Sequence, residues 1–379
     1  MVTQQEIDKC IQAISQTGYV LENSVATVLA EQQWNVMSNR YYLDDVTYAP
    51  REIDLLAYKV KAIDNIRVYT ALIISCKKSD KNAWVFLTKN LNKRDKNIEL
   101  HPINLWSNSR IMLGQNIKQY FLTEISTGVD SDPVLNELFN IDRNIFAYQE
   151  VNLENGTPQN DKRIYDSITT CIKAAEYEKN ALKNTRRQAT VYQFTILNIV
   201  ESRMIEYFCD AQPAIVKETD HIMYLNRFII NKADNFHIIH FITNGYLKQF
   251  LEAMDQYHSW SIEKCKSLHT KYKSEIITNH EMRNLFADEI AKDILFSVRY
   301  KVQYELKSEY SPPEKISIWP NDENTGIVID VNINDSDILE KLNSDQNLLK
   351  KVAKSLEQRA SYQGSFKFGY WDFNDDIPF

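Results

Sequence analysis

The sequence predicts a mixed α/β protein in which helices flank a mixed β-sheet, followed by a smaller α+β region. Three observations carry this prediction. Apolar residues recur at helical spacing over residues 4–33. Several apolar, strand-like segments follow before residue 90. A long helical pattern over 161–183 then leads into further strand patterns between 190 and 242.

Composition narrows the class of protein. The chain has 379 residues, of which 44% are hydrophobic and 25% charged, so it can bury a sizeable core and is not wholly disordered. Only 8 glycines and 9 prolines exclude collagen-like and low-complexity chains. No apolar run approaches the ~18 residues that a membrane-spanning helix needs, and the polar start MVTQQEIDKC does not resemble a signal peptide. We therefore expect no membrane association.

The cysteines and the net charge exclude further classes of protein. The five cysteines are scattered and form no CxxC pair, which predicts neither a disulfide framework nor a zinc site and favours the cytoplasm. The net charge of −7 argues against a protein that coats nucleic acid generally. A nuclease stays possible, because its DNA contacts are local and a bound metal supplies positive charge.

The first unit is expected to span residues 1–260. Its opening helix, 4–33, carries Ile7, Ile11 and Ile14 on one side and is broken near Gly18. A meander of strands is predicted next, at 34–42, 51–60, 66–76 and 83–87. The third of these is apolar enough to be central in a sheet. An insertion at about 88–140 with helical pieces such as 111–121 follows.

The remainder of the chain continues the same alternation. The first unit is completed by a helix at 161–183, a helix at 246–255 and strands at 145–151, 190–200, 203–208, 222–230 and 236–242. A second, α+β unit is predicted at 261–360: helical over 261–300, broken at Ser311-Pro312-Pro313, strand-forming over 315–333 and helical over 335–359. Residues 361–369 are expected to be a loose linker, and 361–379 as a whole a linker and acidic tail.

Residues suited to phosphate chemistry occur in a meaningful order in the first unit. Glu22 lies on the opening helix, Asp54 on the strand REIDLLA, and Ser75-Cys76-Lys77 at the end of the strand IISCKK. Side chains alternate along a strand, so Ser75 and Lys77 share one face while Cys76 packs on the other. Glu52, two residues before Asp54, is expected on the same face as Asp54.

This order resembles the PD-(D/E)xK, restriction-endonuclease-like superfamily, particularly its Mrr-like branch, over about residues 10–90 and as far as 260. The resemblance implies a restriction-endonuclease-like sheet core and a Mg²⁺ or Mn²⁺ cofactor held by Glu22, Asp54 and the backbone carbonyl of Cys76. It also implies that Lys77 orients or deprotonates the attacking water. Such a cation prefers oxygen ligands and lowers the pKa of its bound water.

One position departs from the family pattern. Ser75 stands where an acidic residue is usual, and a neutral hydroxyl is a weaker metal ligand than a carboxylate. Glu52 is the candidate that compensates. Each residue also has an ordinary interpretation: Glu22 as a solvent-facing helix residue, Asp54 as a cap at a strand end, and Lys77 as part of a solvated edge. The predicted catalytic set is Glu22, Asp54, Ser75 and Lys77.

The last nine residues, WDFNDDIPF, form a separate signal. They resemble the acidic C-terminal tip of bacterial single-stranded-DNA-binding protein and differ from it at Trp371 and Asn374. The resemblance implies that Phe379 enters an apolar pocket on a protein that receives such a tail, while its free carboxylate meets a basic rim. An acidic end that matches by chance is the alternative. The matching residues are Asp372, Phe373, Asp375, Asp376, Ile377, Pro378 and Phe379.

These patterns together predict a metal-dependent DNA endonuclease of a bacterial restriction or anti-phage defence type, recruited through its tail. Two alternatives stay open: a catalytically degenerate DNA-binding or adaptor protein on the same scaffold, and an RNA-directed nuclease. A homodimer and a partner in a defence complex are further expectations, because cutting both strands of DNA usually takes two sites. No glycine-rich phosphate loop is present. His237 and His240, three apart in a predicted strand, are poor joint metal ligands.

Overall fold

The structure, a computed structural model, describes residues 2–15 and 17–370. The chain forms two compact units. The N-terminal unit comprises Met1–Lys61, Val68–Asn108 and Lys118–Ile262, and the C-terminal unit comprises Ala62–Arg67, Ser109–Ile117 and Glu263–Phe379. The two short segments, 62–67 and 109–117, thus belong to the C-terminal unit, although the sequence pattern assigned them to the first.

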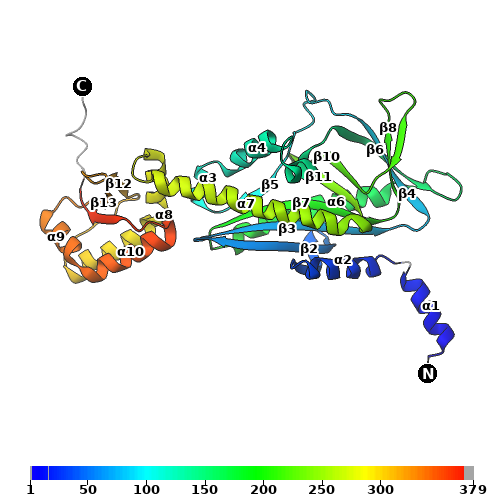
Figure 1. Ribbon diagram of the computed structural model, residues 1–379. Helices are drawn as coiled ribbons and strands as arrows, with labels where there is room; N and C mark the ends of the chain where they lie inside the picture. Colours follow the sequence, from blue (N-terminus) through cyan, green and yellow to red (C-terminus); the bar gives the residue numbers. More distant parts are fainter. Residues whose placement is uncertain (1, 16, 371–379) are drawn as a thin grey trace. The chain divides into compact units, whose positions relative to one another are not determined.

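A seven-stranded mixed sheet forms the core of the N-terminal unit (Figure 1). Strands β1 and β2 are antiparallel, β7 and β11 are parallel, and β11 and β10 are antiparallel. The predicted mixed sheet flanked by helices is confirmed. Its strands, in spatial order, are β1 (Asn35–Leu43), β2 (Pro50–Ile63), β3 (Ile66–Lys78), β7 (Thr190–Glu201), β11 (Ala233–Thr243) and β10 (His221–Ile230), with β5 (Asn104–Ser107) paired to β7.

Helices cover this sheet because each has one apolar stripe. α2 (Tyr19–Glu31) buries Leu21, Val25 and Leu29, which recur about once per turn, and it contacts β1. α6 (Lys162–Thr185) packs against β1 and β7. The first part of α7 (Leu247–Glu275) is tied to β3 by a 2.8 Å hydrogen bond between His258 Nδ1 and Thr70 Oγ1. α1 (Gln4–Ser15) precedes α2 and buries none of its residues.

The strand expected at 83–87 does not extend the meander. It forms β4 (Asn82–Asn90), which belongs to a second, four-stranded sheet with β6 (Arg143–Asn152), β8 (Met204–Phe208) and β9 (Ile215–Glu218). Aromatic packing joins the two sheets. The ring of Phe241 on β11 lies 4.9 Å from that of Phe86 and 6.0 Å from that of Trp84, both on β4. All three side chains are buried.

Phe241→Ala is expected to lower the free energy of unfolding by about 3–5 kcal/mol, because it opens a cavity where the two sheets meet. Chemical denaturation followed by circular dichroism measures this loss. Phe146→Ala is the control, because Phe146 on β6 is exposed and should cost less than about 1 kcal/mol. Equal losses in the two variants would show that Phe241 does not hold the sheets together.

The insertion predicted at 88–140 contains more than helical pieces, because β5 lies within it and joins the main sheet. Its helices are α3 (Arg110–Gly114), α4 (Ile117–Gly128) and α5 (Pro133–Phe139). α5 begins where the side chain of Asp132 accepts hydrogen bonds from the backbone N–H groups of Val134 and Leu135.

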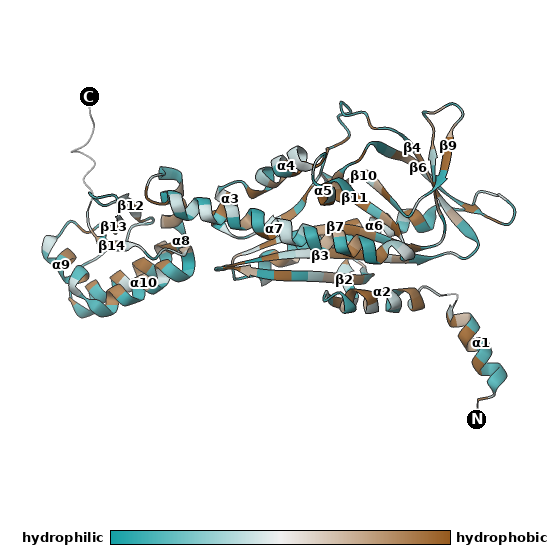
Figure 2. Ribbon diagram, viewed as in Figure 1, coloured by the Kyte–Doolittle hydropathy of each residue, from teal (hydrophilic) through white to brown (hydrophobic). Residues whose placement is uncertain are grey.

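The C-terminal unit combines a three-stranded sheet, ordered β12-β13-β14, with helices α8, α9 and α10. Figure 2 shows hydrophilic and hydrophobic residues alternating along α10, the pattern of a helix with one buried face. A π-helical segment, Tyr300–Glu305, follows α8. The remaining bounds are α8 (His280–Arg299), β12 (Ser317–Pro320), β13 (Gly326–Asp330), α9 (Ser336–Ser344), α10 (Gln346–Ala360) and β14 (Ser365–Phe368).

Three further sequence predictions are wrong. Residues 361–369 are not simply a loose linker, because Ser365–Phe368 pairs in parallel with β13 and buries Phe368. The single helix expected at 335–359 is two helices, since Asp345 ends α9 and caps α10. The helix expected at 246–255 continues to Glu275.

The acidic tail, residues 371–379, lies outside the described residues. Its predicted partner-binding residues, from Asp372 to Phe379, therefore stay predictions from sequence. Over residues 2–15 and 17–370, no helix combines the length and the apolar character needed to cross a bilayer.

Candidate functional site

Three consecutive residues at the end of β3 converge on one carboxylate of β2. Asp54 Oδ2 accepts a hydrogen bond of 2.6 Å from the backbone N–H of Cys76 and one of 3.1 Å from the hydroxyl of Ser75. The Lys77 ammonium lies 3.3 Å from the same oxygen. Three donors on one oxygen hold the carboxylate in a single orientation, and one of them is charged, which strengthens the set.

The strands position these groups without help from a flexible loop. Ser75 and Cys76 are buried, whereas Lys77 and Asp54 are half-buried at the surface. Burial raises the pKa of the Cys76 thiol well above its ordinary value, so the thiol is a neutral, inert packing group. Cys76 therefore contributes through its backbone. Its N–H donates to Asp54. That its carbonyl is a metal ligand stays a prediction.

Two further carboxylates lie at this site. Burial raises the pKa of Glu22 on α2, the charge of Asp54 raises it further, Lys77 lowers it, and Glu52 adds a smaller increase. Glu22 is thus close enough to feel all three charges. Glu52 is exposed on β2 and accepts a 2.6 Å hydrogen bond from the Asn39 side chain. The six predicted residues, Glu22, Glu52, Asp54, Ser75, Cys76 and Lys77, are hereafter the Asp54 site.

The donor set of the Asp54 site suits a hard divalent cation. All its candidate ligands are oxygens, and three of its side chains are carboxylates against the one ammonium of Lys77. Among residues 2–15 and 17–370, no three His, Cys, Asp or Glu side chains are arranged as a ready-made metal cage. Mg²⁺ does not require one, because it is usually held by one or two carboxylates together with water and substrate phosphate.

No protein-family model, curated protein or solved structure matches this chain. A function for this chain is therefore inferred from the residues of the Asp54 site.

Sequence reasoning missed a second polar array in the N-terminal unit. His240 Nδ1 and His221 Nε2 lie 3.1 Å apart, and His221 Nδ1 lies 3.1 Å from Glu137 Oε1. The hydroxyl of Tyr246 donates a 2.6 Å hydrogen bond to the same Glu137 oxygen. Local sequence carried no signal for this array, because Glu137 is separated from His221 by 84 positions.

This array holds the His221 and His240 rings against each other, with their centroids 5.3 Å apart. Burial keeps the pKa of His240 well below its ordinary value, and the neighbouring His221 lowers it further. His237 is buried elsewhere on β11 with neither ring nitrogen bonded to any described residue, and burial lowers its pKa to about 3. His237 thus takes no part in the array that contains His240, and we assign no catalytic role to either residue.

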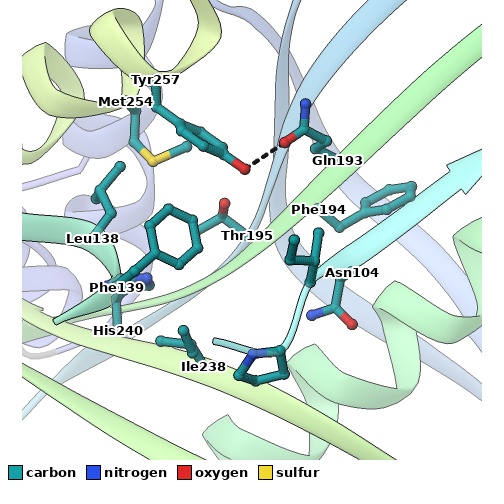
Figure 3. Close-up of a pocket in the computed structure, with 12 residues that line it drawn as sticks. Asn104, Leu138, Phe139, Gln193, Phe194, Thr195, Ile238, His240, Met254 and Tyr257 are labelled. Carbon is teal, nitrogen blue, oxygen red and sulfur yellow. Dashed lines mark hydrogen bonds between the residues drawn. The ribbon is translucent and has the colours of Figure 1, made fainter. Parts of the chain in front are cut away.

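A pocket beside β7 contains one residue of this array (Figure 3). His240, Phe139 and Met254 line it, and the Tyr257 hydroxyl donates a hydrogen bond to the Gln193 side-chain oxygen at its wall. No residue of the Asp54 site lines this pocket. The predicted catalytic residues and the pocket of Figure 3 therefore lie at different places in the N-terminal unit.

Proposed function

We propose that this chain is a metal-dependent nuclease that cleaves DNA at the Asp54 site. One observation carries the proposal: Lys77, the backbone N–H of Cys76 and the Ser75 hydroxyl all meet Asp54 Oδ2, beside Glu22. A helix glutamate, a strand aspartate and a lysine ending the next strand are the parts that the resemblance to PD-(D/E)xK nucleases implies. The order of these three residues in the chain and their proximity in the structure both support a nuclease site.

The residues of the site have distinct tasks in phosphodiester cleavage. Ser75 and Cys76 hold the Asp54 carboxylate in place through their hydrogen bonds. Lys77 presents a cation at the half-exposed rim, where it can orient the attacking water and stabilise negative charge on the phosphate. Asp54, Glu22 and the Cys76 carbonyl would hold a Mg²⁺ or Mn²⁺ ion, which would lower the pKa of a bound water and polarise the phosphate.

Ser75 supports a second candidate function, a nuclease fold that binds DNA without cutting it. The Ser75 hydroxyl donates to Asp54, so it is a positioning group and not a replacement for the missing carboxylate. Incubating the protein with plasmid, linear and single-stranded DNA and with RNA, each with Mg²⁺, Mn²⁺ or EDTA, decides between the candidates. Metal-dependent strand breaks support the nuclease. DNA that is bound and never cut under any of these conditions supports the adaptor.

Glu22→Gln is expected to weaken Mn²⁺ binding by about 10- to 100-fold, because it removes a carboxylate from the donor set and keeps the side-chain shape. Isothermal titration calorimetry with Mn²⁺ measures the change. Glu31→Gln is the matched control, since Glu31 ends the same helix and is exposed. Unchanged affinity in Glu22→Gln would remove Glu22 from the site.

Ser75→Asp is expected to lower the metal concentration that gives half-maximal cleavage. A carboxylate at position 75 would stand against Asp54, where like charges repel until a cation binds between them. Titrating cleavage with Mg²⁺ tests this, and Ser75→Ala is the control that removes the hydroxyl without adding charge. A higher metal requirement in Ser75→Asp than in Ser75→Ala would contradict the prediction.

We assign the recruitment of the nuclease to its C-terminal tail. Residues 371–379 would dock onto proteins that receive the tail of single-stranded-DNA-binding protein and so bring the nuclease to DNA during restriction or anti-phage defence. The resemblance of DDIPF to that tail supports this step. A partner of a defence complex and a second copy of this chain are the other proposed partners.

A further inference from the structure

Two exposed tyrosines flank the acidic groups of the Asp54 site. Tyr19 on α2 is 70% exposed and Tyr41 on β1 is 60% exposed. Leu21, two residues after Tyr19, and Tyr42, next to Tyr41, are both buried. On β1 the exposure therefore alternates from Tyr41 to Tyr42, as it does on a strand with one covered face. Tyr19 is the first residue of α2, where Val20 is also 49% exposed.

The pairing of β1 and β2 places Tyr41 beside Glu52. These two residues are directly opposite each other in the antiparallel ladder, so their side chains are neighbours on one face. Asn39, two residues before Tyr41, bonds to Glu52 and confirms that the three side chains share this face. Tyr42 points the other way, where its ring lies 6.5 Å from that of Tyr177 on α6.

Helix geometry places Tyr19 beside Glu22. The two residues are three apart on α2, the spacing at which side chains of a helix are neighbours. Glu22 in turn feels the charges of Asp54 and Glu52. An exposed aromatic ring therefore lies next to each of the two outer carboxylates of the Asp54 site, one from α2 and one from β1.

We propose that Tyr19 and Tyr41 are stacking platforms for unpaired nucleobases and that the substrate of the Asp54 site is single-stranded or frayed DNA. This inference rests on the proposed nuclease function. Every base presents a π-face, and stacking on an aromatic side chain is favourable and tolerant of sequence. Paired bases inside a duplex have both faces covered by their neighbours, so the platforms select unpaired nucleotides and place their phosphates at Lys77.

The chemistry of the surroundings favours nucleobases as the occupant. Glu22, Glu52 and Asp54 repel an acidic partner, and a divalent cation that arrives with a phosphate backbone offsets this repulsion. Leu43 continues the exposed face beyond Tyr41 and is 51% exposed, which extends the apolar side of the platform. A single strand of nucleic acid fits this arrangement, with a phosphate at Lys77 and bases stacked on the tyrosines at the edges of the site.

The test uses the full chain and its variants Tyr19→Ala, Tyr41→Ala and the corresponding Phe variants. Tyr207→Ala is the control, because Tyr207 is an exposed tyrosine on β8 in the other sheet. The probe is fluorescent oligothymidylate of about 20 nucleotides, longer than the site of one single-strand-binding module. Fluorescence anisotropy with Ca²⁺, a divalent cation that also takes oxygen ligands, measures binding. Cleavage with Mg²⁺ or Mn²⁺ measures activity, and sedimentation measures oligomeric state.

The expected result is a loss of about 10-fold in oligothymidylate affinity for each alanine variant, wild-type affinity in the Phe variants and in Tyr207→Ala, and faster cleavage of single strands than of duplex. Equal cleavage of single strands and duplex, unaffected by either alanine variant, would overturn the inference and leave the proposed nuclease standing. Loss of a dimer in the alanine variants would also overturn it. If the tyrosines are needed for binding but no DNA is cleaved, the role of Tyr19 and Tyr41 in base stacking is supported and the proposed nuclease activity is contradicted.

Discussion

Lys77→Ala is expected to lower the rate of DNA cleavage by about 10²- to 10³-fold, the loss typical of removing one charge-stabilising donor from an active site. The ammonium of Lys77 is 3.3 Å from Asp54 Oδ2, and no other side chain of the Asp54 site carries positive charge. Its fold should persist, because half-exposed ion pairs contribute only about 0–1 kcal/mol. Cleavage assays together with thermal unfolding measure both quantities.

Lys78→Ala is the matched control for this variant. Lys78 is the next residue on β3, but its ammonium pairs with Glu201 at 2.7 Å and with Asp80 at 3.5 Å, away from Asp54. It should retain wild-type cleavage. Asp54→Asn should lose both cleavage and Mn²⁺ binding, since the amide has no charge to offer a metal. Wild-type cleavage by Lys77→Ala or by Asp54→Asn would show that the Asp54 site is not the active site.

A peptide of residues 371–379 is expected to compete with the tail of single-stranded-DNA-binding protein for a protein that receives that tail. The same peptide with an amidated C-terminus, or lacking Phe379, should bind at least about 10-fold more weakly, because the ring and the carboxylate are the two anchors that the resemblance implies. Raising the salt concentration should also weaken binding, since Asp375 and Asp376 act through screened charge.

Fluorescence anisotropy with the labelled peptide measures this competition. A scrambled peptide of the same composition is the control, because it keeps the charge and loses the order. The matching protein experiment adds a C-terminal tag to the full chain, which should be as harmful as deleting Phe379. Equal binding by the free, amidated and scrambled peptides would show that the tail acts only as an acidic segment.

The elements that build the Asp54 site were predictable because their patterns are local. Leu21, Val25 and Leu29 repeat with the helical period and place Glu22 at the edge of the buried face of α2. Alternation along β3 places Ser75 and Lys77 on one face. Such patterns depend on neighbours in the chain, so one sequence is enough to find them.

Elements whose partners are distant in the chain were predicted less well. β4 has the composition of a fourth strand of the meander, but it pairs with β6 and β8, which lie far along the chain. β14 has only four residues, too few for a clear alternating pattern, and it forms a strand because β13 has an edge free to pair with it. Strand pairing is decided by long-range packing, which leaves little trace in local periodicity.

The sequence by itself determined the mixed α/β class, the residue types suited to a metal and a phosphate, and the acidic end DDIPF. Only the tertiary structure showed that Ser75 supports Asp54 through a hydrogen bond and that Tyr41 stands beside Glu52. The physical reason is that periodicity specifies the face on which a side chain lies. Which side chains meet on that face is decided when distant strands and helices pack together.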